Sequence, residues 1–370
     1  MRVLQINSGN LYGGVEVLLH TLAQERHRAP QLQLEFALCY DGKIAQQLRA
    51  QNCPVHLLSP VRFSRPWTIL SARRALKALL KRERYDVVIC HHVWTQGLFG
   101  DIPTQPELLW LHDPPQSQKL HWTERLAARR TPAFVICNSE FTRSYVPRLY
   151  PNTPSKVVYC TVSPPQNTYT PADLAATRRE FKADDSTAVI IQVSRWEPHK
   201  GHLNHVEALA QLTSKNWVCW FVGAAQRPHE VEHQNRVRQR AAELNIADRV
   251  LFLGWQPDVR KLIAAADIYC QPNSGPEPFG LTYIEALYAG KPVIAANAAG
   301  PAEIVTPDCG ALCPPNDNAA VARTLDLWIN NPALRQQLAA HGPARAHALC
   351  DPTVTLNTLA QQLRSLVPLQ

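Results

Sequence analysis

Two carboxylates flank a turn in the stretch NSGPEPFGLTYIEALYAG, residues 273–290. Pro278 and Gly280 predict a tight loop, followed by a helix that begins near Gly280. A helix N-terminus offers unpaired N–H groups and the positive end of the helix dipole, which suits a phosphate. Glu277 precedes the helix and Glu285 lies about one turn inside it, so we predict carboxylates facing opposite ends of one bound molecule. An ordinary loop charge and a solvated helix residue are the alternative. The turn residues that would contact this ligand are Phe279, Gly280, Leu281 and Thr282.

Two cations lie in the segment VSRWEPHKG, residues 193–201, directly after one apolar run and before a helical stretch. In open α/β sheets, ligands bind at the carboxyl ends of the strands. Arg195 offers a planar fork and Lys200 a point charge, and the two are predicted to converge on a diphosphate. Loop cations are commonly solvated, but a position at the same sheet edge as Glu277 favours the binding role.

A glycine pair lies in LYGGVEV, residues 11–17, between a predicted strand and a predicted helix. Gly13 and Gly14 would let the backbone approach a ligand closely. The segment lacks the complete G-x-G-x-x-G pattern of dinucleotide binding, which disfavours hydride transfer.

Histidines end two further predicted strands. His112 follows the apolar strand in LLWLHDPP, residues 108–115, and is predicted to be functional. A histidine at a strand end is otherwise often structural. His91 and His92 end another strand and are either structural or acceptor-lining, with no preference between the two readings.

The alternation of short runs rich in Val, Ile and Leu with longer amphipathic stretches predicts repeated strand–helix units around parallel sheets. Proline-rich residues 161–173 break the alternation and indicate a linker. The predicted fold class is α/β, with two doubly wound parallel-sheet, Rossmann-like domains. We predict an N-terminal domain over 1–165, a C-terminal domain over 166–350, and a segment 351–370 whose helix packs back on the first domain.

Eleven strands are expected from the apolar runs, and the chain beyond residue 316 is expected to be helical with interruptions at Pro332, Pro343 and Pro352. The expected strands lie at 2–7, 33–39, 86–91, 107–111, 133–138, 156–160, 187–194, 216–224, 249–254, 267–272 and 291–296.

The charge of the chain is unevenly distributed. Residues 1–165 contain 20 Lys and Arg against 11 Asp and Glu, a net charge of +9, although the whole chain of 370 residues carries only +8. This basic half is either a solvated surface or attracted to an anionic membrane, substrate or nucleic acid. The segment SARRALKALLKRER, residues 71–84, carries leucines on one face and cations around it, so it is either a surface helix or one that lies on anionic lipid.

No apolar run approaches the roughly 20 residues that span a bilayer, and the N-terminal MRVLQINSGN lacks the apolar stretch of a signal peptide. The ten cysteines are scattered without a CxxC pair, a pattern typical of buried thiols in a reducing compartment. We therefore expect a cytoplasmic protein, associated with the cytoplasmic face of a membrane if the basic helix binds lipid, and no metal site.

With these residues in place, the chain resembles the family 4 glycosyltransferases, which share the GT-B fold. The resemblance spans nearly the whole chain, and the order of its pieces is more specific than any single motif. The pieces are GGVEV near the start, the strand-end His112, CNSEFTR at 137–143, SRWEPHKG, RVLFLGW, and the E-x7-E element from Glu277 to Glu285.

The resemblance implies a retaining, metal-independent transferase without a cofactor. It would move a sugar, expected to be a hexose, from a UDP- or GDP-linked donor to a hydroxyl of a glycan, lipid-linked or small-molecule acceptor. Carried over by position, the catalytic residues are Glu277, at the transferred sugar, and His112, at the donor sugar from the opposite domain. The donor-binding residues are Arg195 and Lys200 at the diphosphate, Glu285 at the ribose, Gly13 and Gly14 over the phosphates, and Phe279, Gly280, Leu281 and Thr282 in the turn.

Three other readings are open. Another GT-B sugar-nucleotide enzyme, an epimerase or phosphorylase, would share the fold. A basic nucleic-acid-binding protein would need a clustered basic face with exposed aromatics, whereas the nine tryptophans are spread along both halves; we expect no nucleic-acid partner. A catalytically silent binding module is disfavoured by the presence of Glu277, Arg195 and Lys200.

Overall fold

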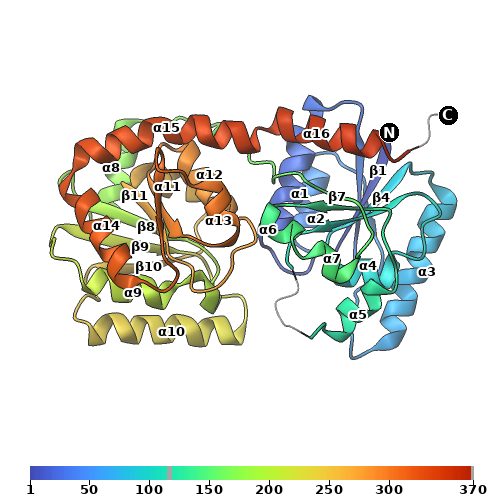
Figure 1. The fold of residues 1–370 in the computed structure, drawn as a ribbon, viewed down its shortest axis with the longest axis horizontal. Helices are drawn as coiled ribbons and strands as arrows, with labels where there is room; N and C mark the ends of the chain where they lie inside the picture. The colour runs from blue at the N-terminus through green and yellow to red at the C-terminus, as the bar shows by residue number, and fades with distance from the viewer. Residues whose placement is uncertain (115–118, 368–370) are drawn as a thin grey trace. The chain divides into compact units, whose positions relative to one another are not determined.

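The computed structural model describes residues 1–114 and 119–367, and the chain divides into two compact units. The first comprises Met1–Ser163 together with the chain from Cys350 onward, and the second comprises Pro164–Leu349. Each unit is built around its own sheet, and Figure 1 shows helices packed around both sheets.

The sheet of the first unit has seven parallel strands in the order β3-β2-β1-β4-β5-β6-β7. Helix α1 contacts both α2 and α16, and helix α4 contacts both α3 and α5. The strands are β1 (Arg2–Asn7), β2 (Gln33–Leu38), β3 (Val55–Leu57), β4 (Val87–Cys90), β5 (Glu107–Leu111), β6 (Phe134–Cys137) and β7 (Ser155–Val157). The helices are α1 (Gly14–Glu25), η1 (Arg26–Arg28), α2 (Lys43–Ala50), α3 (Pro66–Arg82), α4 (Val93–Phe99), α5 (Trp122–Ala128), α6 (Glu140–Arg143), α7 (Val146–Leu149) and α16 (Pro352–Arg364).

The sheet of the second unit has six parallel strands in the order β10-β9-β8-β11-β12-β13. Its strands are β8 (Ala188–Val193), β9 (Trp217–Val222), β10 (Val250–Gly254), β11 (Ile268–Gln271), β12 (Val293–Ala296) and β13 (Gly310–Cys313). Its helices are α8 (Pro171–Glu180), η2 (Pro198–Lys200), α9 (His202–Ala210), α10 (Pro228–Glu243), α11 (Val259–Ala265), α12 (Leu281–Tyr288), α13 (Ala299–Ile304), α14 (Asn318–Asn330) and α15 (Pro332–Cys350).

The predicted fold class is confirmed, because both sheets are parallel and doubly wound. Every residue of β8 and β9 is buried, which explains why these strands read as continuous apolar runs rather than as alternating patterns. All ten cysteines are buried and free of disulfides, as the sequence predicts for thiols inside apolar strands.

Four local expectations are wrong. Strands β3 and β13 were not expected, and both are short strands at the edge of a sheet. Helix α8 begins at Pro171, inside the expected linker, because proline suits the first turn of a helix. Pro343 does not interrupt a helix, because it lies inside α15. Pro332 and Pro352 do separate helices, since each is the first residue of one.

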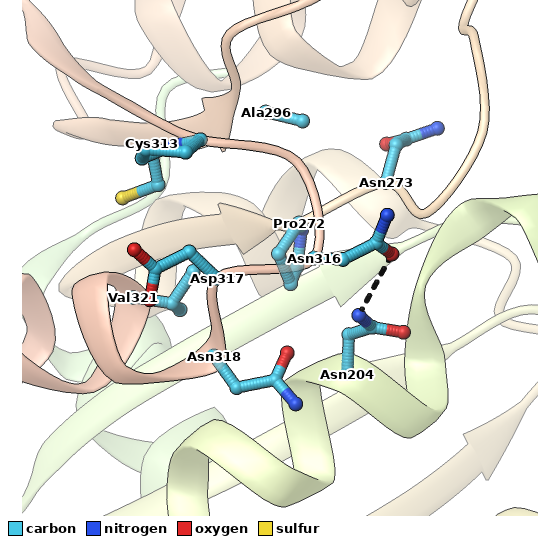
Figure 2. Close-up of a pocket in the computed structure, with 10 residues that line it drawn as sticks. Asn204, Pro272, Asn273, Ala296, Cys313, Asn316, Asp317, Asn318 and Val321 are labelled. Carbon is cyan, nitrogen blue, oxygen red and sulfur yellow. Dashed lines mark hydrogen bonds between the residues drawn. The ribbon is translucent and has the colours of Figure 1, made fainter.

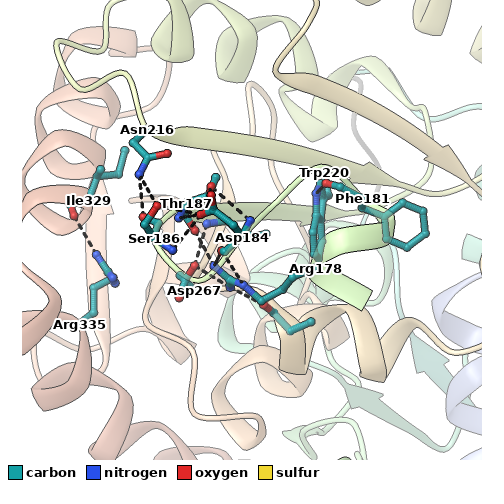
Figure 3. A network of polar contacts seen from close by, with 12 residues as sticks. Arg178, Phe181, Asp184, Ser186, Thr187, Asn216, Trp220, Asp267, Ile329 and Arg335 are labelled. Atoms are coloured by element: carbon teal, nitrogen blue, oxygen red, sulfur yellow. Dashed lines mark hydrogen bonds and ion pairs between the residues drawn. The ribbon is translucent and has the colours of Figure 1, made fainter. Parts of the chain in front are cut away.

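A network of partly buried hydrogen bonds fixes α8 to the amino ends of β8 and β11 (Figure 3). Arg178 Nη1 donates to the Ala265 carbonyl at 2.9 Å and to Asp267 Oδ2 at 3.1 Å. The same carboxylate accepts from the Val189 backbone at 2.7 Å. This network lies at the edge opposite to the carboxyl ends of the strands, so it anchors the start of the second unit and stays clear of its ligand edge.

The final helix, α16, belongs to the first unit. Thr355 and Thr161 share a buried hydrogen bond of 2.6 Å, and the Val162 amide donates to the Cys350 carbonyl at 3.1 Å. These contacts tie the end of the chain to the segment that follows β7.

Candidate functional site

The loop after β11 ends at the amino terminus of α12, on the carboxyl edge of the second unit's sheet. Gly280 precedes the helix with φ of +102°, a conformation that favours glycine. A Cβ atom at this position would lie 2.3 Å from Cδ2 of Tyr283. The helix therefore starts at Leu281, close to where the sequence predicts it, and its first amide groups lie at the ligand edge.

Glu277 is a buried, charged side chain in this loop. It is therefore not the ordinary solvated loop charge that was the alternative interpretation. Its Oε2 accepts hydrogen bonds from Lys200 Nζ and, at 3.3 Å, from Asn273 Nδ2. Burial opposes ionisation of the carboxyl, but the Lys200 ammonium outweighs it and leaves the pKa of Glu277 below its usual value. Tyr283 Oη in turn donates to Asn273 Oδ1 at 2.8 Å, so the amide that holds Glu277 is itself fixed.

Lys200 reaches Glu277 because two loops pack backbone against backbone. Gly201 has φ of +75°, and a Cβ atom there would lie only 1.9 Å from the Pro272 carbonyl oxygen. The Ser274 amide also donates to the His199 carbonyl at 3.0 Å. The segment after β8 is thus fixed against the segment after β11, at the point where the strand order of the sheet reverses.

Arg195 is held by a different pair of carboxylates. Its Nη2 lies 2.5 Å from Glu197 Oε1 and 2.5 Å from Glu230 Oε1. Glu230 is fully buried at the start of α10 and also accepts from the Gln226 amide at 2.6 Å. Arg195 Nε is buried and has no hydrogen-bond partner among the described residues. This guanidinium therefore has one N–H donor that could bind a ligand.

The acidic groups around Arg195 also bring a histidine close. One ligand atom from each of Glu197, His229 and Glu230 lies within 4.8 Å of the others. The Arg195 guanidinium contacts both carboxylates and already supplies a positive charge there. The chemistry of this cluster therefore fits an arginine held by carboxylates.

Glu285 lies on α12 with its Oε1 3.9 Å from Arg260 Nε. Burial raises the pKa of Glu285, and the Arg260 charge offsets only part of that rise. Among the turn residues, Phe279 is buried and the Thr282 hydroxyl accepts from Tyr269 Oη at 2.7 Å. The loop and helix thus bring Glu277, Gly280, Thr282 and Glu285 into one continuous segment at the carboxyl edge.

A small hollow lies beside this segment, over the ends of β11, β12 and β13 (Figure 2). Its polar lining is mostly amide, and Asn204 Nδ2 donates to Asn316 Oδ1 at 3.2 Å across it. The acidic residue Asp317 lines it as well, but its Oδ1 accepts from the Ala320 amide at 2.8 Å and caps α14. No lysine or arginine lines the hollow, so the cations that would bind a phosphate lie outside it.

In the first unit, Gly13 and Gly14 lie at the amino terminus of α1, after β1. The Gly13 amide donates to Glu16 Oε2 at 3.0 Å, and Asn7 Nδ2 donates to Glu16 Oε1 at 3.0 Å. The glycine turn is therefore braced by a carboxylate from the first turn of its own helix. A role of Gly14 over phosphates stays a prediction.

His112 follows β5 and is nearly buried, with its ring in a chain of hydrogen bonds. Its Nε2 lies 2.9 Å from His91 Nδ1, and His91 Nε2 lies 2.5 Å from Gln5 Oε1. Burial lowers the pKa of His112 well below its usual value, with the other histidines adding to the shift. Asn138 Nδ2 holds the His112 carbonyl at 3.1 Å.

The segment 71–84 forms most of α3, and its apolar face is occupied. Leu76 and Leu79 are buried in the first unit's core. Arg73 is engaged as well, since it pairs with Asp101 at 2.7 Å. Trp67, near the start of the helix, is 65% exposed. Among the described residues, no helix is long and apolar enough to cross a membrane.

Several residues that shape these sites were not predicted from the sequence, namely Gln5, Asn138, Glu197, Glu230, Asn273 and Tyr283. Asn138 follows β6 and Asn273 follows β11, so the rule used for the charged residues would also have found these two. Glu230 gives no such signal, because it lies inside the first turn of an unremarkable surface helix.

Two family models together match most of the chain. The model of glycosyl transferases group 1 matches residues 175–345, and the model of glycosyltransferase family 4 matches residues 12–165. The lipopolysaccharide core biosynthesis glycosyltransferase LpsD of Rhizobium meliloti is 30% identical over 168 residues, covering 45% of this chain and 46% of LpsD. A D-inositol 3-phosphate glycosyltransferase of Mycobacterium sp. (strain KMS) is 28% identical over 276 residues, covering 72% of this chain and 59% of that protein. The alignments span about half the length of several of the curated relatives that the chain matches.

Solved structures share the fold over the full length. Anabaena Alr3699/HepE, in complex with UDP-glucose, superposes with a TM-score of 0.88 at 24% identity and covers 99% of this chain and 100% of that one. Sucrose-phosphate synthase from Thermosynechococcus elongatus superposes with a TM-score of 0.83 at 21% identity, covering 99% and 98%. With a matching family model on each half and this two-domain fold, the chain belongs to the family 4 glycosyltransferases.

Proposed function

We propose that this chain transfers a sugar from a nucleoside diphosphate sugar to an acceptor hydroxyl, with retention of anomeric configuration and without a metal ion. The donor is proposed to be a UDP- or GDP-linked hexose. The observation that carries the proposal is the contact of Lys200 with Glu277 beside the amino terminus of α12. A cation suited to phosphate and a carboxylate suited to sugar hydroxyls lie side by side, which is where the sugar–phosphate bond of such a donor would lie.

The chemistry follows from the charges that develop as this bond breaks. The bond between the anomeric carbon and the phosphate oxygen breaks, so negative charge grows on the diphosphate and positive charge on the ring. Lys200, Arg195 and the first amides of α12 would stabilise the leaving group, at about 3 kcal/mol for each contact that strengthens in the transition state. The acceptor oxygen bonds to the anomeric carbon from the same face, and its proton passes to the departing phosphate.

The acceptor is proposed to be a hydroxyl of a glycan, lipid-linked or small-molecule acceptor. Relatives of this chain include proteins described as lipopolysaccharide core biosynthesis glycosyltransferases and as a monoacylated phosphatidylinositol monomannoside mannosyltransferase. The competing reading, an epimerase or phosphorylase of the same fold, is disfavoured by the family match on both halves.

A donor panel tests this proposal. Binding to the native protein raises its stability by RT ln(1 + [L]/Kd), about 2.7 kcal/mol at a ligand concentration 100 times Kd. UDP and GDP are first compared by thermal shift, and the hexose donors of the preferred base are then incubated with saccharide acceptors, with and without EDTA. Acceptor-dependent release of nucleoside diphosphate that survives EDTA, with the donor's anomeric configuration in the product, supports the proposal. Release of the diphosphate that does not require an acceptor, or full inhibition by EDTA, contradicts it.

Glu285 is predicted to distinguish ribose from 2'-deoxyribose. A carboxylate that accepts from ribose hydroxyls contributes a charged hydrogen bond of about 1.5–3 kcal/mol. Replacing Glu285 with Ala is therefore expected to weaken binding of the ribonucleoside diphosphate about tenfold or more and to leave the deoxy analogue nearly unchanged. Titration calorimetry of the parent, of Glu285→Ala and of the matched variant Arg260→Ala measures this. A variant with the parent's preference for ribose would remove Glu285 from this role.

Membrane contact through residues 71–84 is a separate proposal. It rests on the exposed cations Arg74, Lys77 and Lys81, with exposed Trp67 near the start of the same helix. Each cation near an anionic surface contributes about 1 kcal/mol, so neutralising the three is expected to lower sedimentation with anionic liposomes at least about tenfold. Binding should weaken as salt rises.

A charge-matched control neutralises three exposed cations of the second unit, Lys182, Lys215 and Arg323, and should leave liposome binding intact. Arg73 is omitted because its pairing with Asp101 makes it part of the fold. Equal losses in both triple variants, or binding to neutral liposomes, would return α3 to the reading of a surface helix.

A further inference from the structure

Strand register brings three polar side chains to one edge of the first unit's sheet. β1 pairs Ile6 with Cys90 of β4, and β4 pairs Cys90 with Leu109 of β5. His91 is the next residue after Cys90, and its amide donates to the Ile6 carbonyl at 3.0 Å. Parallel strands end at a common edge of their sheet. Three neighbouring strands, β1, β4 and β5, therefore bring together the side chains of Gln5, His91 and His112.

These contacts form one hydrogen-bonded row. Gln5 Oε1 lies 2.5 Å from His91 Nε2, and His91 Nδ1 lies 2.9 Å from His112 Nε2. Gln5 and His91 are fully buried and His112 is 5% exposed. The two imidazole rings are nearly parallel, at an interplanar angle of 8°. No other side-chain hydrogen bond of His112 exists among the described residues, so its Nδ1 is the ring atom left for a ligand.

The chemistry of the row fixes the direction of each hydrogen bond. An amide oxygen only accepts, so His91 Nε2 must carry the hydrogen. Burial lowers the pKa of His91 to about 3, which keeps its ring neutral, and a neutral imidazole with a protonated Nε2 has a lone pair on Nδ1. His112 Nε2 must then donate to it. Since His112 is also neutral, its Nδ1 in turn carries a lone pair.

We propose that Gln5 and His91 are positioning residues that set the tautomer of His112, so that it presents a neutral Nδ1 acceptor to a donor-sugar hydroxyl. This proposal rests on the proposed function only for the identity of the ligand. A sugar ring gains positive charge as its bond to phosphate breaks, so an acceptor lone pair stabilises it, whereas an imidazolium would repel it. The row thereby uses a neutral amide, Gln5, to give a buried histidine a defined tautomer.

Substitutions at Gln5 test whether the hydrogen bonds of the row run in the proposed direction, with His91 donating to Gln5 and His112 donating to His91. Gln5→Glu keeps an acceptor opposite His91 Nε2 and should preserve the tautomer of His112. Gln5→Leu removes the acceptor, so His112 should then adopt a mixture of its two neutral tautomers. Gln96→Leu is the matched control, because Gln96 is another fully buried amide of the same unit, and its Nε2 donates to the Arg130 carbonyl at 2.8 Å, away from the row.

The primary readout is the nitrogen spectrum of the full chain labelled with 15N-histidine, in the absence of any donor. Long-range proton–nitrogen correlations report which ring nitrogen is protonated, and His91→Phe and His112→Phe assign the signals among the 14 histidines. We expect His112 to be protonated at Nε2 in the parent, in Gln5→Glu and in Gln96→Leu, and mixed in Gln5→Leu. Protonation of His112 at Nδ1 in the parent, or an unchanged tautomer in Gln5→Leu, overturns the proposal.

Kinetics give a second readout once a donor is identified. Gln5→Leu is expected to lower kcat about tenfold, the scale of one lost hydrogen bond, with little change in KM for the donor. Gln5→Glu is expected to restore kcat, a rescue that a merely structural role of Gln5 would not produce. If the parent transfers no sugar, the spectra still decide the tautomer, so failure of the proposed function and failure of the row are distinguishable.

Discussion

Glu277→Gln is expected to lower the turnover of sugar transfer by about 100-fold or more, the scale of losing a contact that strengthens in the transition state. The carboxylate would bind hydroxyls of the transferred sugar as positive charge grows on its ring. Its contacts indicate that the loss should be chemical rather than structural, because glutamine can keep the hydrogen bond from Asn273 and fills the same volume. Turnover is measured with the donor that the panel identifies.

The pairing of Glu277 with Lys200 also predicts the direction in which the affinity for free nucleoside diphosphate changes. In the donor-free protein the carboxylate neutralises Lys200, so its removal leaves the ammonium free to bind a diphosphate. Free nucleoside diphosphate, which has no sugar, should therefore bind Glu277→Gln at least as tightly as it binds the parent. Glu232→Gln, an exposed change on α10, serves as the control. Transfer at near the parental rate, or a defect confined to nucleotide affinity, would show that the catalytic assignment of Glu277 is wrong.

The parallel sheets could be predicted because buried parallel strands leave a strong signal. β9 is apolar throughout and β8 is apolar except for Gln192, and the strand–helix alternation around them predicts one fold class. The edge strands β3 and β13 could not be found in this way, since VHL and GALC are too short to show a period. Pro343 misled for a related reason: a proline disfavours a helix interior, but tertiary contacts can hold the helix together across it.

The sequence placed Arg195, Lys200, Glu277 and Glu285 at one edge of the second unit, and the structure places all four there. It did not reveal that Glu277 pairs with Lys200 or that Glu230 pairs with Arg195. Glu277 follows Lys200 by 77 residues and Glu230 follows Arg195 by 35, so these pairs depend on how loops of different strands pack. The glycine at 201 was visible, but the need for it is set by the approach of the Pro272 carbonyl, which no local pattern encodes.

Lys200 is expected to bind diphosphate rather than nucleoside. Charged hydrogen bonds contribute about 1.5–3 kcal/mol, so removing the ammonium should weaken binding of the nucleoside diphosphate by about tenfold to 100-fold and binding of the nucleoside very little. A single Lys200→Ala variant would leave Glu277 buried without its cation and could damage the loop. The double variant Lys200→Met/Glu277→Gln, compared with Glu277→Gln alone, avoids this by removing the cation from a background that has already lost the carboxylate.

The same reasoning applies to Arg195, so substitution of its partner Glu230 tests whether the guanidinium binds diphosphate. Glu230→Gln loosens the hold on the guanidinium and is expected to tighten diphosphate binding, and Arg195→Met in that background is expected to reverse the gain. Lys215→Ala, at an exposed lysine before β9, is the control for lost charge. Calorimetric titration with the nucleoside and with its diphosphate reads all variants on one scale. If each variant loses the same factor for both ligands, the cations do not bind the diphosphate, and the donor must be held by other groups at this edge.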